Sequence, residues 1–457
     1  MTGGYGPDVT AVTTAPRLRR GIHVGYALGS IGTAAFGTVP GLLLLFYLTD
    51  VLGVAAGLAG LVVFLPKAWD VLVNPWIGAR SDRTDGRWGP RRPWMLAGGL
   101  ALPPLFVLMF AGPGGPPGAA SAWVAVTFLL AATAYGCFQV PYIAQPAEIT
   151  DDPEERATLM SWRVGVLALG ILLAGAGAPA VVDAVGGGRG GYLAMAAFVA
   201  VLLGGGMSGA VAGTRSAPTL TRVRSEGGLR SNVALAWRSR PFRLLLVGYV
   251  VQALGIGVML AGVPYYSEHV LHRPNAGSYL FAALVGPAIL VMPLWLRISR
   301  RQGKRFGLLT ATAVFAVAAA ALALGGRDRM PLVIGLVVLV GIGYAGMQMF
   351  PLAMLPDAIA ADESASGRRR AGVFTGVWTA AETLGLAVGP GLLGGLLGLA
   401  GYASSTGNEH VVQTSTAVLA VRLGFSVLPA VLVLISLPVL ARYRLDPVPV
   451  PVEEPAA

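Results

Sequence analysis

The chain has 457 residues, of which 55% are hydrophobic and 12% charged, and its mean hydropathy is +0.68. Soluble globular domains carry about 25% charged residues, so this composition excludes an ordinary soluble protein and predicts a polytopic membrane protein. The net charge of +11 would suit a nucleic-acid-binding protein. The arginines, however, form short clusters between apolar segments, as in the basic loops of membrane proteins, and we expect no nucleic-acid partner. The single cysteine, Cys137, excludes a disulfide framework within the chain.

Residues 1–21 form a polar segment rich in Gly, Pro and Thr, and we predict a cytoplasmic N-terminal tail. A signal peptide is disfavoured because the apolar stretch that follows is long and lacks a clear small-residue cleavage site. Stretches long enough to cross about 30 Å of hydrocarbon then recur. The predicted all-α fold has twelve transmembrane helices, at approximately 22–49, 57–80, 93–112, 119–146, 158–183, 190–213, 242–267, 276–298, 306–326, 331–356, 371–402 and 411–441.

Basic residues decide the predicted orientation. The segments on the side of the two termini hold most of the lysines and arginines, including the clusters at 80–92 and 215–243. The loops on the opposite side hold four: Arg189, Arg273, Arg327 and Arg329. By the positive-inside rule, both termini are expected in the cytoplasm and the chain in the cell membrane.

The longest loop between predicted helices, at 214–241, divides the chain into two bundles of six helices. These bundles are 22–213 and 242–441, with a cytoplasmic tail at 442–457. SDRTDGRWGPRR after the second helix is echoed by SRRQGKRFG after the eighth, its counterpart in the second bundle. Two pseudo-symmetric bundles around a central linker are typical of secondary transporters built from internal repeats.

Three polar residues interrupt the second apolar segment. Lys67, Asp70 and Asn74 are three and four positions apart, so they share one face of a helix. An ionised group inside the bilayer costs about 2.5–3.5 kcal/mol on insertion scales, so this face should border the protein interior or a pathway. Asp50 and Arg422 lie near helix ends on the side opposite the termini, where they would form a gate or anchor the helices at the interface.

Sequence blocks then indicate a family. Residues 78–83, GARSDR, resemble the loop motif of the major facilitator superfamily. The blocks 70–94, 140–163 and 354–389 resemble one branch of it, the glycoside–pentoside–hexuronide:cation symporters, typified by the melibiose permease. The resemblance runs from about residue 22 to 440. It implies secondary transport by alternating access, coupled to Na⁺, Li⁺ or H⁺, with no cofactor, metal site or catalytic residue.

The resemblance implies a cation-coupling site at Asp70, Lys67 and Asn74. Asp70 keeps the first of the two acids that bind the cation in the melibiose permease. The second acid is replaced by Asn74, the neighbouring asparagine by Val73 and a threonine by Gly136. Because most oxygen ligands of a Na⁺ cage are lost, we expect H⁺ rather than Na⁺ to bind at Asp70, with Lys67 influencing its pKa. A structural ion pair between Lys67 and Asp70 is the alternative.

The sugar site departs from the family pattern in the same way. Two aspartates that bind sugar align with Ala34 and Gln139, and a tryptophan with Ile143, while an arginine is kept as Arg163. Carboxylates accept strong hydrogen bonds from hydroxyls, so their loss favours a less hydrophilic solute. The expected substrate-binding residues are Gln139, Tyr142, Arg163, Trp378, Thr379, Glu382 and Tyr26. The expected gating residues are Gly78, Asp82, Arg83, Asp357 and Glu363.

The leading hypothesis is therefore a cation-coupled symporter of a small organic solute, sugar-like or related, acting as a monomer. The alternative within transport is a proton-coupled exporter of a drug-like or secondary metabolite. A membrane-embedded enzyme is disfavoured, because no nucleophile motif, phosphate loop or metal cluster is present. The GxGxxG match at 389–394 follows no strand, so the dinucleotide-binding interpretation fails, and the four scattered histidines form no metal motif.

Overall fold

The computed structural model describes residues 18–84, 88–89, 91–113, 115–150, 152–218, 234, 236–366, 371–406 and 411–444. Most of the two predicted tails and of the linker at 214–241 lie outside these residues. Within them, twelve helices are long and apolar enough to cross a membrane, which confirms the predicted all-α fold class.

The first six spans pack against one another as one group, in which α1 contacts α5 and α6, and α4 contacts α2 and α3. Of two π-helical segments, η1 (Pro40–Leu44) completes the first span and η2 (Tyr47–Val51) follows it. The α-helices of this half are α1 (Arg20–Val39), α2 (Ala56–Asp82), α3 (Arg92–Phe110), α4 (Pro117–Ile149), α5 (Pro153–Ala184) and α6 (Gly188–Gly213).

The second six spans form the other group, in which α8 contacts α12 and α14, and α11 contacts α9 and α10. Short segments η3 (Tyr266–Val270), η4 (Leu322–Leu324) and η5 (Arg327–Arg329) lie at the ends of its helices. The α-helices are α8 (Arg240–Tyr265), α9 (Ala276–Gln302), α10 (Lys304–Ala321), α11 (Met330–Ser366), α12 (Ala371–Leu399), α13 (Ser415–Phe425) and α14 (Val427–Ala441).

Two spans depart most clearly from the prediction. Helix α11 continues to Ser366, past the predicted end at 356, because hydropathy marks the apolar part of a helix and not the polar turns that follow it. The last span breaks at Ser426, between α13 and α14. Pro429, three residues after the break, has no N–H to donate to a carbonyl of the preceding turn.

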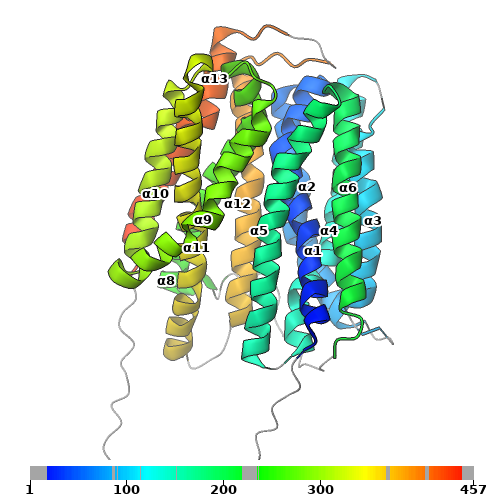
Figure 1. Ribbon diagram of the computed structural model, residues 1–457, viewed down its shortest axis with the longest axis vertical. Helices are drawn as coiled ribbons and strands as arrows, with labels where there is room; N and C mark the ends of the chain where they lie inside the picture. Colours follow the sequence, from blue (N-terminus) through cyan, green and yellow to red (C-terminus); the bar gives the residue numbers. More distant parts are fainter. Residues whose placement is uncertain are drawn as a thin grey trace, which may run out of the picture.

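Both described ends of the chain lie at the same end of the bundle, since α1 begins and α14 finishes there (Figure 1). We call this end the termini side and the opposite end the distal side. Near the distal side the two halves pack closely through α2 and α12, where a Cβ added at Gly394 would lie 2.6 Å from the carbonyl oxygen of Ala56. Gly175 of α5 likewise lies directly against the ring of Phe281 of α9. Small residues permit such close helix contacts.

Candidate functional site

The predicted coupling acid lies inside the first half of the bundle. Asp70 is 3% exposed, so it does not face lipid. Among the described residues its carboxylate has no hydrogen-bond or ion-pair partner. One turn along α2, Oδ1 of Asn74 is also buried without a partner. A Cβ at Gly136 of α4 would lie 2.5 Å from that oxygen, so α4 contributes only backbone there.

Lys67 lies on the same helix but faces aromatic rings. Its Nζ is 4.7 Å from the ring centre of Phe36, 5.7 Å from that of Tyr135 and 5.9 Å from that of Phe128. These rings come from α1 and α4. The described contacts include no ion pair between Lys67 and Asp70, so the structural ion pair considered from the sequence is not formed. The (i, i+3) spacing permitted that pair, but the aromatic rings hold the ammonium instead.

Four of the predicted substrate residues come together in the first half. The rings of Tyr26 and Tyr142 stack with centres 4.7 Å apart, and the Tyr142 hydroxyl donates to the backbone oxygen of Tyr26 at 2.7 Å. The Arg163 guanidinium lies 5.7 Å from the Tyr142 ring. Gln139, one turn before Tyr142 on α4, has a buried Oε1 without a partner. Tyr26 and Tyr142 are fully buried, and the Tyr142 ring also stacks on Phe138 with centres 5.2 Å apart. This group therefore offers a cationic head and an unpartnered amide oxygen beside packed aromatic rings.

Two more predicted residues meet in the second half. Trp378 of α12 stacks on Tyr249 of α8 with ring centres 4.5 Å apart, and its indole N–H has no partner. The Tyr249 hydroxyl lies 2.5 Å from Oε1 of Glu382 and 2.9 Å from Oε1 of Gln348. Thr379, in contrast, is exposed and donates to the Thr375 carbonyl of its own helix.

The Tyr249 hydroxyl carries one hydrogen but has two acceptor oxygens beside it. The hydroxyl can donate fully to only one of Glu382 and Gln348, and the other contact becomes a full hydrogen bond when that residue supplies a hydrogen of its own. Glu382 can donate a hydrogen bond to the Tyr249 oxygen when its carboxyl is protonated. Gln348 can donate one when its amide is rotated by 180°, so that the NH₂ group faces the hydroxyl. The arrangement thus couples the proton on Glu382 to the orientation of its neighbours.

Residues of the predicted gating loop contact Arg91, which the sequence reading did not single out. Arg91 forms ion pairs with Asp82 at 2.5 Å and with Glu148 at 2.7 Å, and it donates to the Ser81 hydroxyl. It therefore joins the termini-side ends of α2 and α4 at the start of α3. A Cβ added at Gly78 would lie 3.5 Å from the Val140 side chain of α4, which is an ordinary contact distance. Arg83 is exposed.

The second half has a comparable contact on the termini side. The Lys304 ammonium at the start of α10 lies 2.6 Å from Oδ2 of Asp357 on α11 and also donates to the backbone oxygen of Ala353. Glu363, two turns further along α11, is half-buried. These contacts stay within the second half.

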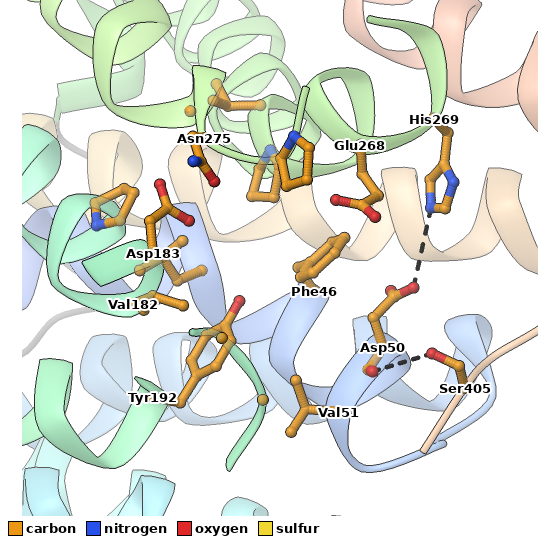
Figure 2. Close-up of a pocket in the computed structure, with 18 of the residues that line it drawn as sticks. Phe46, Asp50, Val51, Val182, Asp183, Tyr192, Glu268, His269, Asn275 and Ser405 are labelled. Atoms are coloured by element: carbon orange, nitrogen blue, oxygen red, sulfur yellow. Dashed lines mark hydrogen bonds and ion pairs between the residues drawn. The ribbon is translucent and has the colours of Figure 1, made fainter. Parts of the chain in front are cut away.

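A cavity of about 650 Å³ lies between the halves on the distal side. From the first half it is lined by Asp50, Asp183 and Tyr192, and from the second by Glu268 and Asn275, among others (Figure 2). None of the residues predicted for substrate or cation binding lines this cavity. Its walls come from η1, η2 and η3, from the distal ends of α5, α6, α8 and α9, and from α13 with the segment before it.

A hydrogen-bond chain beside this cavity joins the two halves, and we call it the distal latch: Asp50, Tyr402 and His269. The Tyr402 hydroxyl donates to Oδ1 of Asp50 at 2.7 Å, and Nε2 of His269 lies 2.6 Å from the same hydroxyl. Because the Tyr402 hydrogen goes to Asp50, the hydrogen between His269 and Tyr402 must come from Nε2. Arg422, considered from the sequence as the partner of Asp50 in a gate, is not part of this chain.

Further contacts support the distal latch. Oγ1 of Thr49 lies 2.6 Å from the Tyr265 hydroxyl, and this contact joins η2 to α8. The Ser405 hydroxyl donates to the Asp50 backbone oxygen at 3.0 Å, as Figure 2 shows. Asp50 lies beyond the first candidate span, which ends at Leu44. Burial raises the pKa of Asp50 to about 7, opposed by the hydrogen bonds from Thr49 and Tyr402.

The sequence did not identify the residues that contact the predicted site residues but belong to no motif. These residues are Arg91, Tyr249, Gln348, His269 and Tyr402. Their roles depend on contacts between segments that are far apart in the sequence. The aromatic rings around Lys67 gave no signal either, since such rings in an apolar segment are typical of a packed core. Within the described ranges, no group of three or more His, Cys, Asp or Glu side chains could hold a metal ion.

Comparison with known proteins points to one family over nearly the whole chain. The family described as MFS/sugar transport protein matches residues 25–447. Inner membrane symporter YicJ of Escherichia coli is 25% identical over 92% of this chain and 90% of its own length. The isoprimeverose transporter of Lactiplantibacillus pentosus is 23% identical over 88% of this chain and 84% of its own.

Solved structures show the same fold. A bacterial homologue of the human lysosomal transporter Spinster superposes with a TM-score of 0.66 at 13% identity, covering 94% of this chain and 98% of that one. The nucleoside transporter NupG gives a TM-score of 0.62 at 13% identity, covering 93% and 100%. Together with the family match, these structures indicate a membrane transporter and not an enzyme.

Proposed function

Because the chain belongs to the family of MFS/sugar transport proteins, we propose that it carries a sugar-like or related small organic solute across the cell membrane together with a cation, with H⁺ favoured over Na⁺. The relatives named as symporters support coupling to a cation. The observation that carries the proposal is Asp70, a buried carboxylate without a hydrogen-bond or ion-pair partner among the described residues. Ionisable residues in such positions are usually functional.

The preference for H⁺ follows from the surroundings of this acid. A hard cation such as Na⁺ needs several oxygen ligands, and near Asp70 the unpartnered side-chain oxygen is that of Asn74. Gly136, on the facing helix, adds no side-chain ligand. A proton needs only the carboxylate itself, so it is the cation that this site accommodates best.

The proposed solute site is formed by the two aromatic groups described above. Arg163 beside Tyr142 would form one side, and Glu382 beside Trp378 the other, with the buried rings holding these polar groups in place. The guanidinium and the carboxyl would take hydroxyl or charged groups of a sugar or glycoside. In alternating access the halves rock about this site.

The contacts between the halves support a distally closed state. Glycine packing between α2 and α12 and the distal latch both lie on the distal side, whereas the ion pairs of Arg91 and Lys304 on the termini side stay within one half. If both termini are cytoplasmic, as the basic loops predict, this is the conformation that faces the cytoplasm.

The test is uptake into liposomes containing the purified protein. Radiolabelled methyl glycosides, disaccharides, glucuronides and pentoses would be offered under an imposed pH gradient, a Na⁺ gradient or neither. Accumulation of at least one sugar-like solute that follows the pH gradient supports the proposal. Accumulation driven by Na⁺ alone would contradict the preference for H⁺, and extrusion of solute in exchange for protons would favour the exporter. Transport of no sugar-like solute would overturn the assigned substrate class.

A further inference from the structure

Three aromatic rings form a preassembled enclosure for the Lys67 ammonium. The Phe36 ring stacks on Tyr135 with centres 4.6 Å apart and meets the edge of Phe128 at 6.1 Å. Phe36 and Phe128 are fully buried. Since the rings hold one another in place, the enclosure does not depend on Lys67 for its shape. We call these three rings the aromatic cage.

Lys67 in the aromatic cage is close to a second attractive position. It precedes Asp70 by three residues, which places the two side chains on one face of α2 with Cβ atoms about 5–6 Å apart. The Asp70 carboxylate has no ion-pair partner in this state, and the lysine side chain has four rotatable bonds. A rotation of that side chain alone would move the ammonium from the rings toward the carboxylate.

We propose that Lys67 is a resident cation, which the aromatic cage holds in reserve and which takes the place beside Asp70 that a cation from solution would otherwise occupy. An ammonium is attracted to the faces of aromatic rings, so the aromatic cage is a genuine alternative to the carboxylate. The inference rests on the proposed coupling role of Asp70 and deepens it. It explains why Asn74 and Gly136 leave the site short of oxygen ligands: the chain supplies its own positive charge.

The proposal makes a prediction about cations in solution. Removing the ammonium should leave Asp70 and Asn74 open to a small cation, so the variant should acquire a cation response that the natural chain lacks. Ligand binding to the folded state raises the melting temperature, and this measurement needs neither the solute nor transport. It would be made on purified protein with NaCl, LiCl or methylammonium chloride, using choline chloride at equal ionic strength as reference.

Lys67→Ala is expected to gain a rise in melting temperature of about 3 °C in methylammonium over choline, and a smaller rise in Na⁺ or Li⁺, for which the site has few oxygen ligands. Lys67→Met, which refills the aromatic cage with an apolar chain of similar length, should gain the same response if Lys67→Ala does not fold. Lys67→Arg should behave as the natural protein, and adding Asp70→Asn to Lys67→Met should abolish the response. Lys304→Ala is the matched control, because it removes the chain's other lysine, which is paired with Asp357.

Two outcomes would overturn the proposal that Lys67 is a resident cation. One is a folded Lys67→Met variant that responds to none of the three cations, and the other is a natural protein that already responds to Na⁺. Failure of the proposed transport function would be seen separately, as absence of solute uptake in liposomes under any gradient. The melting experiment would still report on Lys67 in that case.

Discussion

The Tyr402 hydroxyl donates a 2.7 Å hydrogen bond to the carboxylate of Asp50, and this bond crosses from the second half of the molecule to the first. His269 donates in turn to Tyr402. Any conformation that opens the distal side must separate these groups. The distal latch therefore contributes to the free-energy difference between the distally closed and distally open states.

Replacing Tyr402 with Phe should shift that balance toward the distally open state. Hydrogen bonds to charged groups contribute about 1.5–3 kcal/mol, so the open population should rise about tenfold or more. Spin labels at Val185 and Val412, both exposed on the distal side, would report the separation in a Cys137→Ser background. Tyr443→Phe is the control, since that hydroxyl is buried without a partner. If Tyr402→Phe leaves the distribution of distances between the two spin labels unchanged, the Tyr402 hydroxyl does not contribute to closing the distal side.

Closure of the distal side should also depend on pH through Asp50. In the closed state burial raises the pKa of Asp50 to about 7, whereas in water an Asp titrates near 3.9. The closed state therefore binds the extra proton between these values, and its stability should fall as pH rises from about 4 to about 7 and level off above. The titratable groups packed around Asp50 are His269, Glu268, Tyr265, Tyr402 and Tyr192.

The same spin labels, read between pH 4 and 8, would follow this dependence. Asp50→Asn should flatten the profile across that window while leaving the protein folded. A profile with the same slope in Asp50→Asn would assign the pH dependence to another group.

Substituting Gly394 by Ala should destabilise the distally closed state. Its added Cβ would lie 2.6 Å from the backbone oxygen of Ala56 and 2.9 Å from Cα of Gly60, so the two helices must move apart. Such overpacking costs about 1–3 kcal/mol. The closed population and the transport rate should both fall.

Gly395→Ala provides the matched control, since nothing lies within 4 Å of the added Cβ. That variant should retain the natural rate, or gain stability from the higher helix propensity of Ala. Equal effects at positions 394 and 395 would argue against close helix packing as the cause.

The pair of Tyr249 and Glu382 should act as one unit in solute binding. Glu382→Gln should weaken solute affinity by about tenfold. It should also remove the pH dependence of that affinity, because an amide, unlike the carboxyl of Glu382, neither gains nor loses a proton. Tyr249→Phe should have a similar effect, and the double variant should cost less than the two effects added. Thr383→Val is the control, as its hydroxyl bonds only within α12. If the free-energy changes of the two single variants simply add in the double variant, Tyr249 and Glu382 act independently in solute binding.

The membrane spans were predictable because apolar length is set by the bilayer, and the twelve predicted spans correspond to the twelve candidate spans of the structure. Their ends were less predictable, as α11 shows, because helices continue into water. Asp70 stood out as a charge in an apolar segment, and its burial could be anticipated. The aromatic cage around Lys67 could not, since it depends on how α1 and α4 meet α2, and no local pattern encodes that meeting.

The measurement that tests the account most directly is solute accumulation by Asp70→Asn in liposomes under an imposed pH gradient. The account predicts that accumulation is lost while exchange of labelled for unlabelled solute continues, because the site and the rocking motion remain but the proton has no carrier. Asp328→Asn, an exposed distal carboxylate, should accumulate normally. Full accumulation by Asp70→Asn would contradict the account.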